Sequence, residues 1–402
     1  MPVTSTSCLD RARSVAAPLR IVRASVYLLA LPLVRTFRSA YGRSSGRKRV
    51  MAVRLEDADG VTGWGEAPVP DRPQYGADTV ESTWFALTEL ILPPLLGREL
   101  GGPAAAAATW SDLIGQNYAK NAAETACWAI ASQRLGEPLA RLWGGTRDLV
   151  PVGESFPICD SAGALLEEVS ARLAEGFGRV KLKIAPGWDV APARAVRSAF
   201  PGVPLSVDAN CGYALSGGPL LDRVLAPGGA PWAELDELGL VMIEQPLPGD
   251  ALLDLAELQR SLRTPVCLDE SASAVNVTRT ALALGAGRVV NIKPPRLGGI
   301  LPSLGVHDLC VSLGVPAWCG GMLETGIGRG FNLGLAALPG FTLHSDMSPA
   351  RLFYAADLVD PTFDIRPDGC IAVPARPGNG FPVVPERVAE ATIRSWESDT
   401  KG

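Results

Sequence analysis

Five short apolar runs in the middle of the chain end in charged side chains, and this repeat constrains the fold more than any other feature. The runs are RVKLKI with Lys181 and Lys183, LSVDAN with Asp208, LVMIEQP with Glu244, PVCLDES with Asp269 and RVVNIKP with Lys293. Counted from Lys183, the charged residues follow one another after 25, 36, 25 and 24 positions. Each interval fits one strand–helix–strand crossover. The repeat therefore predicts parallel strands connected by helices.

A series of such units builds a parallel sheet with helices outside it, either closed as a (β/α)₈ barrel or left open. In a barrel, polar residues at the carboxyl ends of the strands surround the mouth of the active site. A lone aspartate at a strand end is most often a helix cap. Three acids and two lysines in the same phase of successive units instead favour one functional cavity.

The charged residues indicate a metal site with bases beside it. Asp208, Glu244 and Asp269 offer hard oxygen ligands, which repel one another unless a divalent cation such as Mg²⁺ (or Mn²⁺) lies among them. Lys183 and Lys293 flank the carboxylates in the sequence, and a lysine near a metal and another cation loses its proton more readily. The set favours removal of a proton next to a substrate carboxylate, with the enediolate stabilised by the metal.

The ordered motifs KLK, DAN, IEQP, LDES and NIKP resemble those of the enolase superfamily, in its muconate-lactonising branch with two lysines. The resemblance extends over about residues 20–385. Three finer motifs, KIAPGWD (183–189), VNIKPPRLGG (290–299) and WCGGMLETGIGR (318–329), are similar to the group of o-succinylbenzoate synthases and N-acylamino acid racemases. This resemblance implies an α/β fold, a (β/α)₇β-type TIM barrel with an α+β capping domain.

A chain of 402 residues exceeds one ordinary domain and suits a barrel with a second domain. We expect a disordered tail over 1–18, the capping domain with its lid loops over 19–145, the barrel over 146–346 and a C-terminal segment that completes the capping domain over 347–402. Residues 20–67 predict a three-stranded meander around the turn ADG, and residues 78–142 are expected to be helical. The barrel begins with PVGESF, and FTLHSD (341–346) is its eighth strand.

Two loops of the capping domain are candidates for a lid. Residues 36–47 (TFRSAYGRSSGR) are rich in serine, glycine and arginine, which is typical of a mobile loop. By the resemblance, this loop covers the substrate together with residues 70–78 (PDRPQYGAD). Phe37 and Tyr75 are the candidates for apolar contacts with the substrate. The alternative is that they only anchor their loops.

Other residues are candidates for substrate binding or for supporting the metal: Lys181, Asn210, Ser155, Arg296, Gly320, Gly321, Met322 and Glu324. Lys181 shares a strand face with Lys183 and is a candidate donor to the substrate carboxylate. A guanidinium from Arg296 within ~6 Å of Lys293 would lower the pKa of that lysine. The alternative is that Arg296 pairs with an acid at the barrel rim. Glu324, beyond the seventh strand, is expected to line the site.

Composition excludes several other classes of protein. The net charge of −5 gives no sign of nucleic-acid binding. The eight cysteines lack any C-x-x-C pair, so we expect neither a zinc ribbon nor a disulfide framework, and a reduced cytoplasm is the simpler location. The two histidines are too few for most histidine-based sites, and we expect His307 to be structural. No run reaches the ~18 apolar residues that span a bilayer.

The resemblance implies the activity of an o-succinylbenzoate synthase, a carbon–oxygen lyase that removes water from a cyclohexadiene carboxylate in menaquinone biosynthesis. Lys183 would abstract the α-proton, and Lys293 would stabilise the enediolate by its charge. The same set supports an N-acylamino acid racemase, with the lysines acting on opposite faces of the substrate. We expect a homo-oligomer that acts on a small-molecule carboxylate.

Three alternatives are less favoured. A dipeptide epimerase needs an acidic D-x-D at strand eight, which FTLHSDMSPA lacks, and a muconate cycloisomerase is a further member of the same branch. A non-catalytic, enolase-like scaffold would be expected to have lost one of the five charged residues.

The interval from Asp208 to Glu244 exceeds its neighbours, and the excess falls in LAPGGAPWAELDELG (225–239). A segment between a helix and the next strand lies on the N-terminal face of a barrel, away from the chemistry. We therefore expect this insertion to leave the site intact, although it could alter a subunit contact.

Overall fold

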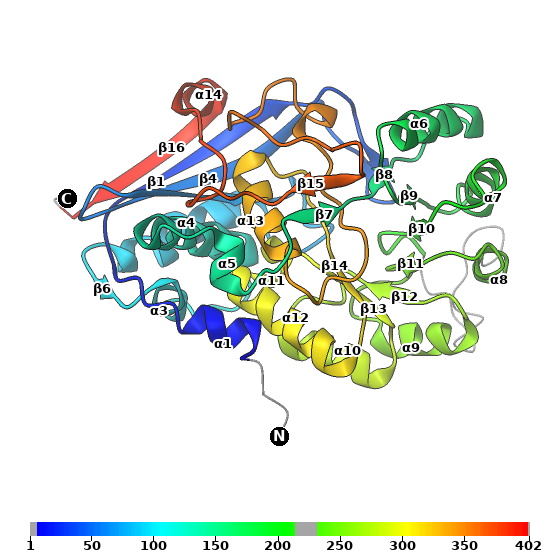
Figure 1. Ribbon diagram of the computed structural model, residues 1–402, viewed down its shortest axis with the longest axis horizontal. Coiled ribbons are helices and arrows are strands. Elements are labelled where there is room, and N and C mark those ends of the chain that lie inside the picture. The colour runs from blue at the N-terminus through cyan, green and yellow to red at the C-terminus, as the bar shows by residue number, and fades with distance from the viewer. Residues whose placement is uncertain (1–5, 214–230, 401–402) are drawn as a thin grey trace.

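The computed structural model describes residues 6–213 and 231–400, which form two packed domains (Figure 1). A curled parallel sheet with helices outside it makes the barrel, and an antiparallel sheet with its own helices makes the capping domain. The predicted combination of a TIM-type barrel with an α+β capping domain is confirmed.

The barrel sheet contains seven described parallel strands, which pair in chain order. They are β8 Glu154–Phe156, β9 Val180–Lys183, β10 Leu205–Asp208, β11 Ile243–Glu244, β12 Val266–Leu268, β13 Val289–Ile292 and β14 Ala317–Cys319. Almost all of their residues are buried. Strands read as continuous apolar runs because helices cover their outer face and side chains fill the barrel.

Helices cover the outside of this sheet. They are α6 Ala162–Ala174, α7 Val190–Ala199, α9 Leu252–Ser261, α10 Val275–Leu284, α12 Ile300–Leu313 and α13 Gly326–Ala336. The hydroxyls of Ser161 and Thr325 cap α6 and α13 by accepting N–H groups of the first turn. Gly285 and Gly314 end α10 and α12 in the left-handed conformation. These caps set where each helix begins and ends relative to the strands.

Residues 341–346, expected as the eighth strand, close the barrel without forming a continuous strand. Phe341 forms a parallel bridge with Ala317 on one side, and Ser345 forms one with Val152 on the other. Backbone N–H groups of the segment donate to carbonyls of both neighbours. Because its hydrogen bonds are divided in this way, the segment forms isolated bridges rather than a ladder.

The strand register brings the charged residues of the repeat to one rim. Lys183, Asp208 and Glu244 are direct neighbours across β9, β10 and β11. Asp269 and Lys293 directly follow β12 and β13. Because parallel strands end at the same edge, all five residues meet at the carboxyl rim of the barrel.

The capping domain contains the predicted meander. Its sheet has the order β16-β1-β4-β5, with β1 Leu19–Pro32, β4 Arg47–Asp57, β5 Thr62–Ala67 and β16 Thr392–Asp399, and β6 Glu99–Leu100 also pairs with β1. The other elements are the hairpin β2 Arg38–Ser39 and β3 Gly42–Arg43, and the helices α2 Val80–Phe85, α3 Pro103–Ala108, α4 Asn117–Leu135 and α5 Leu139–Trp143. Helix α4 packs closely on β5 because Gly65 has no side chain. A Cβ atom at this position would lie 2.0 Å from the Ala122 carbonyl oxygen.

The expectation of a disordered tail is wrong for residues 8–13. Helix α1 (Cys8–Arg13) begins at Ser7, whose hydroxyl accepts the N–H of Asp10 at 3.0 Å. Asp308 of α12 accepts the N–H of Leu9 at 2.8 Å. This cap and the contact with α12 order the segment, although its sequence shows no periodicity. Residues 1–5 lie outside the described residues.

The C-terminal segment returns to the capping domain, as expected. Strand β15 (Cys370–Ala372) pairs with β7 (Leu149–Pro151) near the start of the barrel. Helix α14 (Pro385–Ala391) then leads into β16, which pairs antiparallel with β1 at the edge of the capping sheet. The chain therefore crosses the barrel before it completes the first domain.

The insertion between β10 and β11 is described only in part, because residues 214–230 lie outside the described residues. The remainder contains α8 (Trp232–Asp236). Asp236 accepts the backbone N–H of Thr264 at 2.7 Å, immediately before β12 begins. This contact places α8 at the N-terminal side of the barrel sheet, away from the charged rim.

Two buried glutamates connect the domains. Glu66 of β5 accepts the N–H groups of Thr325 at 3.0 Å and Gly328 at 2.9 Å, at the start of α13. Glu124 of α4 accepts the N–H of Leu301 at 2.9 Å, at the start of α12. The first N–H groups of a helix lack partners within the helix, and its positive end favours a carboxylate. These glutamates hold the capping domain on two helices of the barrel.

Candidate functional site

A cavity of ≈230 Å³ lies at the carboxyl ends of the barrel strands and beneath the two lid loops. The predicted site residues that line it are Phe37, Tyr75, Ser155, Lys181, Lys183, Asn210, Lys293, Gly321 and Met322. The three carboxylates of the repeat are buried at the rim. The structure thus brings most of the predicted residues together around one space.

Each of these carboxylates is paired with a lysine. The distances from ammonium to carboxylate are 2.6 Å for Lys183–Asp208, 2.9 Å for Lys181–Glu244 and 2.7 Å for Lys293–Asp269. The side-chain amide of Asn291 also donates to Glu244, at 2.7 Å. Because a lone charge is costly to bury, this pairing of three cations with three anions allows the three carboxylates to be buried.

The buried carboxylates have pKa values that are shifted in opposite directions. Burial, together with the charge of Asp208, raises the pKa of Glu244 to about 7. Burial also favours a raised pKa for Asp269, but Lys293 and Arg296 outweigh it and hold that pKa below its usual range. Repulsion among these acids is what a divalent cation would relieve, and their oxygens are the ligands that hard cations prefer. The three residues therefore fit a divalent metal.

Lys183 and Lys293 approach the cavity from opposite sides of the barrel. Lys183 ends β9 and Lys293 follows β13, and three strands of the sheet lie between them. The ammonium of Lys293 also lies 4.7 Å from the centre of the Tyr75 ring. A planar carbon held between the two lysines presents one face to each of them.

Lys181 is held from three sides. Its ammonium lies 2.6 Å from Asp346, 2.9 Å from Glu244 and 3.4 Å from Asp208, and 4.6 Å from the centre of the Trp318 ring. Burial lowers the pKa of Lys181, but the three acids outweigh burial and raise it above the ordinary value. Lys181 is therefore a permanently charged donor at the wall of the cavity.

Arg296 lies in α11 (Pro294–Leu297) and pairs with an acid at the rim, which was the alternative to a role in tuning Lys293. Its guanidinium donates to Asp269 and, at 3.1 Å, to the Tyr75 hydroxyl. Arg296 thus joins a candidate metal ligand to a residue of the lid.

The expected lowering of the pKa of Lys293 is wrong as a net effect. Burial lowers this pKa, and Arg296 lowers it further. Asp269 and Glu244 raise it by more, so that the pKa of Lys293 lies above the ordinary value. The sequence showed the guanidinium near Lys293 but did not show how closely both carboxylates approach the ammonium.

Glu324 does not line the cavity, which corrects another expectation. Its carboxylate accepts the backbone N–H of Met322 at 2.9 Å and the side-chain amide of Asn332 at 3.0 Å. It also lies 3.3 Å from Arg329, and the side chain is buried. These partners direct Glu324 inward, where it supports the loop that carries Met322 into the cavity.

Gly320 and Gly321 are required because they lack side chains. A Cβ atom on Gly320 would lie 2.3 Å from Oδ1 of Asn291 and 2.5 Å from Cε of Lys293. A Cβ atom on Gly321 would lie 2.4 Å from Nη1 of Arg329. Gly320 is not a wall of the cavity, but it leaves the space that Lys293 occupies.

Ser155 and Asn210 both line the cavity but differ in their contacts. The Oγ atom of Ser155 is buried and has no hydrogen-bond partner among the described residues. Asn210 has a φ of 44°, and its N–H donates to Oδ1 of Asp208 at 3.0 Å. Asn210 thus fixes a candidate metal ligand, whereas Ser155 leaves a polar atom for a ligand.

The lid is held over the cavity by two tyrosines. The Tyr75 hydroxyl donates to Asp269 at 2.6 Å, and the Tyr41 hydroxyl donates to Glu270 at 2.5 Å. The two rings meet edge to face, with their centres 6.4 Å apart. Both lid loops are therefore connected to the end of β12, which carries a candidate metal ligand.

Several residues of the cavity were not found from the sequence: Ser39, Tyr41, Leu323, Arg329, Asp346, Ser348 and Phe353. Asp346 was the one that the sequence could have indicated, because it ends the predicted eighth strand. The others lie in loops, in the short hairpin strand β2, near a helix start or in the C-terminal segment, where no periodicity indicates which side chains face inward.

A second group of potential metal ligands, Cys8, His307 and Asp308, lies between α1 and α12. Nδ1 of His307 lies 2.9 Å from Asp308, and its Nε2 accepts the N–H of Gly340 at 3.1 Å. Both ring nitrogens therefore have protein partners, so we interpret this group as structural, as expected for His307.

None of the described helices is long and apolar enough to cross a membrane. The predicted location in the cytoplasm stays a prediction, and so does the homo-oligomer.

The chain is similar to known proteins over most of its length. The chain is 39% identical to an o-succinylbenzoate synthase from Geobacillus kaustophilus over 364 residues, covering 90% of this chain and 94% of that protein. It is 42% identical to an N-succinylamino acid racemase from Thermus thermophilus over 362 residues, covering 90% and 94% respectively. The crystal structure of an enolase-superfamily member from Listeria innocua superposes with a TM-score of 0.87 at 32% identity, covering 95% of this chain and 99% of that one.

Two family models match the two domains. The mandelate racemase / muconate lactonizing enzyme N-terminal domain matches residues 25–144, and the enolase C-terminal domain-like family matches residues 164–387. Proteins of this kind generally use a divalent metal. The matches cover more than half of the chain and both domains, and the chain belongs to the enolase superfamily.

Proposed function

We propose that the protein is an o-succinylbenzoate synthase, which catalyses an Mg²⁺-dependent dehydration. The observation that carries this proposal is the rim of three buried carboxylates with Lys183 and Lys293 on opposite sides of one cavity. Likeness to o-succinylbenzoate synthases over most of the chain supports the choice of substrate, a cyclohexadiene carboxylate with a succinyl group.

Each side chain of the site has a role in this reaction. Asp208, Glu244 and Asp269 would hold Mg²⁺, whose charge stabilises the negative charge that develops on the substrate carboxylate. Lys181 donates a hydrogen bond to that carboxylate. Lys183 takes the proton from the α-carbon. The protonated Lys183 can return this proton to the departing hydroxyl group, so that water leaves and no second base is needed.

Racemisation of N-acylamino acids is the second candidate, and the position of Lys293 favours it. Lys183 and Lys293 lie on opposite sides of the cavity, so one lysine can remove the α-proton while the other protonates the opposite face. The likeness to N-succinylamino acid racemases supports this activity as an alternative or as a second reaction at the same site.

Other reactions of the same branch fit the cavity less well. A dipeptide epimerase needs a carboxylate for the substrate ammonium, but Asp346 is already paired with Lys181 and Arg179. A muconate cycloisomerase is disfavoured only by the closer likeness to the synthases and racemases. A non-catalytic scaffold is disfavoured because all five charged residues are present at the rim.

The test is to assay the purified protein for both reactions with Mg²⁺ and after treatment with a chelator. We expect metal-dependent dehydration, and exchange of the α-proton of N-succinylamino acids in heavy water. Exchange without dehydration would support the racemase as the sole activity. Absence of both reactions in the Mg²⁺-loaded protein would contradict the proposal and favour a scaffold.

A further inference from the structure

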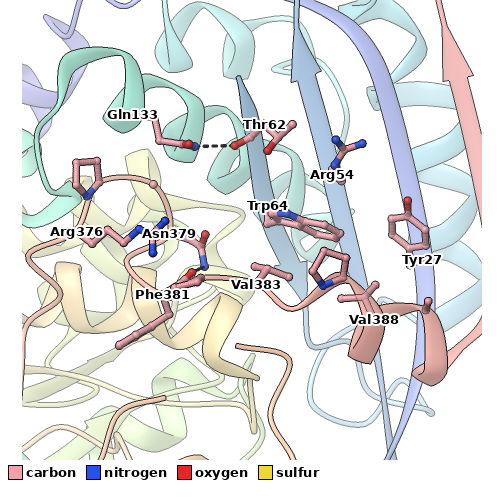
Figure 2. Close-up of a pocket in the computed structure, with 15 residues that line it drawn as sticks. Tyr27, Arg54, Thr62, Trp64, Gln133, Arg376, Asn379, Phe381, Val383 and Val388 are labelled. Atoms are coloured by element: carbon pink, nitrogen blue, oxygen red, sulfur yellow. Dashed lines mark hydrogen bonds between the residues drawn. The ribbon is translucent and has the colours of Figure 1, made fainter. Parts of the chain in front are cut away.

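A second cavity, of ≈550 Å³, lies outside the barrel site, between the capping sheet and the C-terminal segment (Figure 2). Its volume lies within the range of small-molecule sites, which often form where two parts of a chain meet. The sheet side presents Tyr27, Arg54 and Trp64, and residues 376–389 form the other side. None of these residues was assigned a role in the barrel reaction.

The charge of this cavity is one-sided. None of the described residues that line it is acidic, although the chain has a net charge of −5. Arg54 donates to Glu56 at 3.1 Å, so its charge is partly offset. Arg376 is exposed and has no acidic partner within the described parts of the chain. About one positive charge is therefore left for a ligand, which suits a single carboxylate.

The sheet side of the cavity is aromatic. Trp64 is the direct cross-strand partner of Arg54, and Tyr27 lies on the next strand with its ring centre 5.9 Å from that of Trp64. In Figure 2, Trp64 lies between Tyr27 and Arg54 on the sheet side and Arg376 and Asn379 on the loop side. An aromatic face beside guanidinium groups suits a planar ring that carries an anionic group.

The loop side of the cavity is fixed in place. The N–H of Gly378 donates to the Ser132 hydroxyl at 2.9 Å, and the side-chain amide of Asn379 donates to the Phe381 carbonyl at 2.9 Å. The Asn379 carbonyl packs so closely on α13 that a Cβ atom on Gly330 would lie 1.7 Å from it. A wall held in this way is already formed before a ligand arrives, which lowers the entropic cost of binding.

We propose that this cavity is a second ligand site, for a monocarboxylate with a planar ring. The ring packs on Trp64, and the carboxylate lies against Arg376. The site is separate from the barrel cavity, with which it shares no lining residue. Its occupation therefore does not depend on the reaction at the barrel rim.

The test uses benzoate as the probe and isothermal titration calorimetry of the full chain. We expect benzoate to bind the wild type, and Arg376→Gln to weaken this binding by about fivefold or more, as expected for the loss of a partly exposed charged contact. Benzamide, which has the same ring without the charge, should bind much more weakly. Arg288→Gln is the matched control, because it removes an exposed arginine that does not line the cavity.

Thermal unfolding would verify that both variants are folded. Unchanged benzoate affinity in Arg376→Gln would place the anion elsewhere, including at the barrel site, and would overturn the proposal. Equal weakening by Arg376→Gln and Arg288→Gln would show a general effect of net charge and would also overturn it. The same holds for equal affinity for benzoate and benzamide, or for no binding at millimolar benzoate.

Discussion

Asp346 binds Lys181 with one carboxylate oxygen, at 2.6 Å, and accepts a hydrogen bond from the buried guanidinium of Arg179 with the other. The Trp318 ring packs against both cations, with its centre 4.6 Å from Nζ of Lys181 and 4.8 Å from Cζ of Arg179. Buried charges need such partners, because an unpaired one is strongly destabilising. Asp346 therefore positions Lys181 from the interior of the barrel.

Asp346→Asn should raise the KM for the carboxylate substrate by about tenfold, the effect of losing one charged contact. The asparagine keeps an oxygen for Arg179 but turns an amide toward Lys181, so that the ammonium shifts away from the cavity. Steady-state kinetics would separate KM from kcat. An unchanged KM in a variant that unfolds at the wild-type temperature would mean that Asp346 only neutralises Arg179.

The metal ligands are tested by Asp208→Asn, Glu244→Gln and Asp269→Asn. Each should reduce activity by at least about a hundredfold at saturating Mg²⁺, because a ligand contributes several kcal/mol of charge stabilisation. The far-ultraviolet circular dichroism spectrum should remain that of the wild type. A loss smaller than about tenfold for any one variant would remove that residue from the ligand set.

The lid should lose its order when its tyrosine contacts are removed. Tyr41→Phe deletes the hydrogen bond to Glu270 but keeps the ring that meets Tyr75. We expect faster proteolysis within residues 36–47 and a KM that is raised several-fold, since a hydrogen bond contributes about 0.5–1.5 kcal/mol. In the wild type, a carboxylate ligand with Mg²⁺ should protect the same segment.

Tyr27→Phe is the matched control for this experiment, because Tyr27 lines the second cavity, which shares no residue with the barrel site. Equal protease sensitivity of Tyr41→Phe and the wild type would show that the lid is held by other contacts.

The charged rim could be predicted from the sequence because strand periodicity and chain spacing are local. Lys183 and Asp208 each end an apolar run, and parallel pairing then makes them neighbours in the sheet. Nothing local indicates that Tyr41 reaches Glu270, a residue 229 positions away. That contact depends on how the two domains are docked.

The same limit explains the wrong expectation for Glu324. Its position after the seventh strand suggested that it faces the cavity. Its carboxylate is instead surrounded by Arg329 and Asn332 of α13 and by the N–H of Met322, which precedes that helix. The carboxylate could have faced either the cavity or the interior. The choice depends on partners that only the folded chain brings together.

Arg296→Gln should impair racemisation more than dehydration. Arg296 lowers the pKa of Lys293, although Asp269 and Glu244 raise it by more. Removing the guanidinium raises this pKa further, so a smaller fraction of Lys293 is present as the neutral amine, and only racemisation needs Lys293 to accept a proton. Isotope exchange measured from each enantiomer of an N-acylamino acid should slow mainly for one of them.

The geometry provides a check on this prediction. Arg296 also binds Asp269 and the Tyr75 hydroxyl, so its loss could disturb the metal ligand and the lid. Tyr75→Phe, which removes the hydroxyl that contacts both Arg296 and Asp269 but keeps the guanidinium of Arg296, is the control. Equal losses in both reactions and from both enantiomers would leave Arg296 a purely structural residue.

Docking of the capping domain should depend on pH through Glu66. Burial raises the pKa of Glu66 to about 8, against an ordinary value of 4.5, despite the hydrogen bonds from Thr325. Between pH 4.5 and about pH 8, Glu66 keeps its proton in the folded chain and releases it in the unfolded chain. The contribution of Glu66 to stability therefore falls as the pH rises. From pH 6 to pH 8 the free energy of unfolding of the wild type should fall by roughly 2 kcal/mol relative to Glu66→Gln, which cannot titrate.

Urea unfolding of both proteins across this range would measure the difference. Glu137→Gln is the matched control, because the side chain of Glu137 is exposed. The prediction concerns the difference between the wild type and Glu66→Gln in how the free energy of unfolding depends on pH. The rim carboxylates titrate in both proteins, so their contribution cancels in this difference. Parallel curves for Glu66→Gln and the wild type would mean that the N–H groups of Thr325 and Gly328 keep Glu66 ionised in the folded protein. The domains would then be joined by a charged cap, and their docking would be strengthened by the helix dipole of α13.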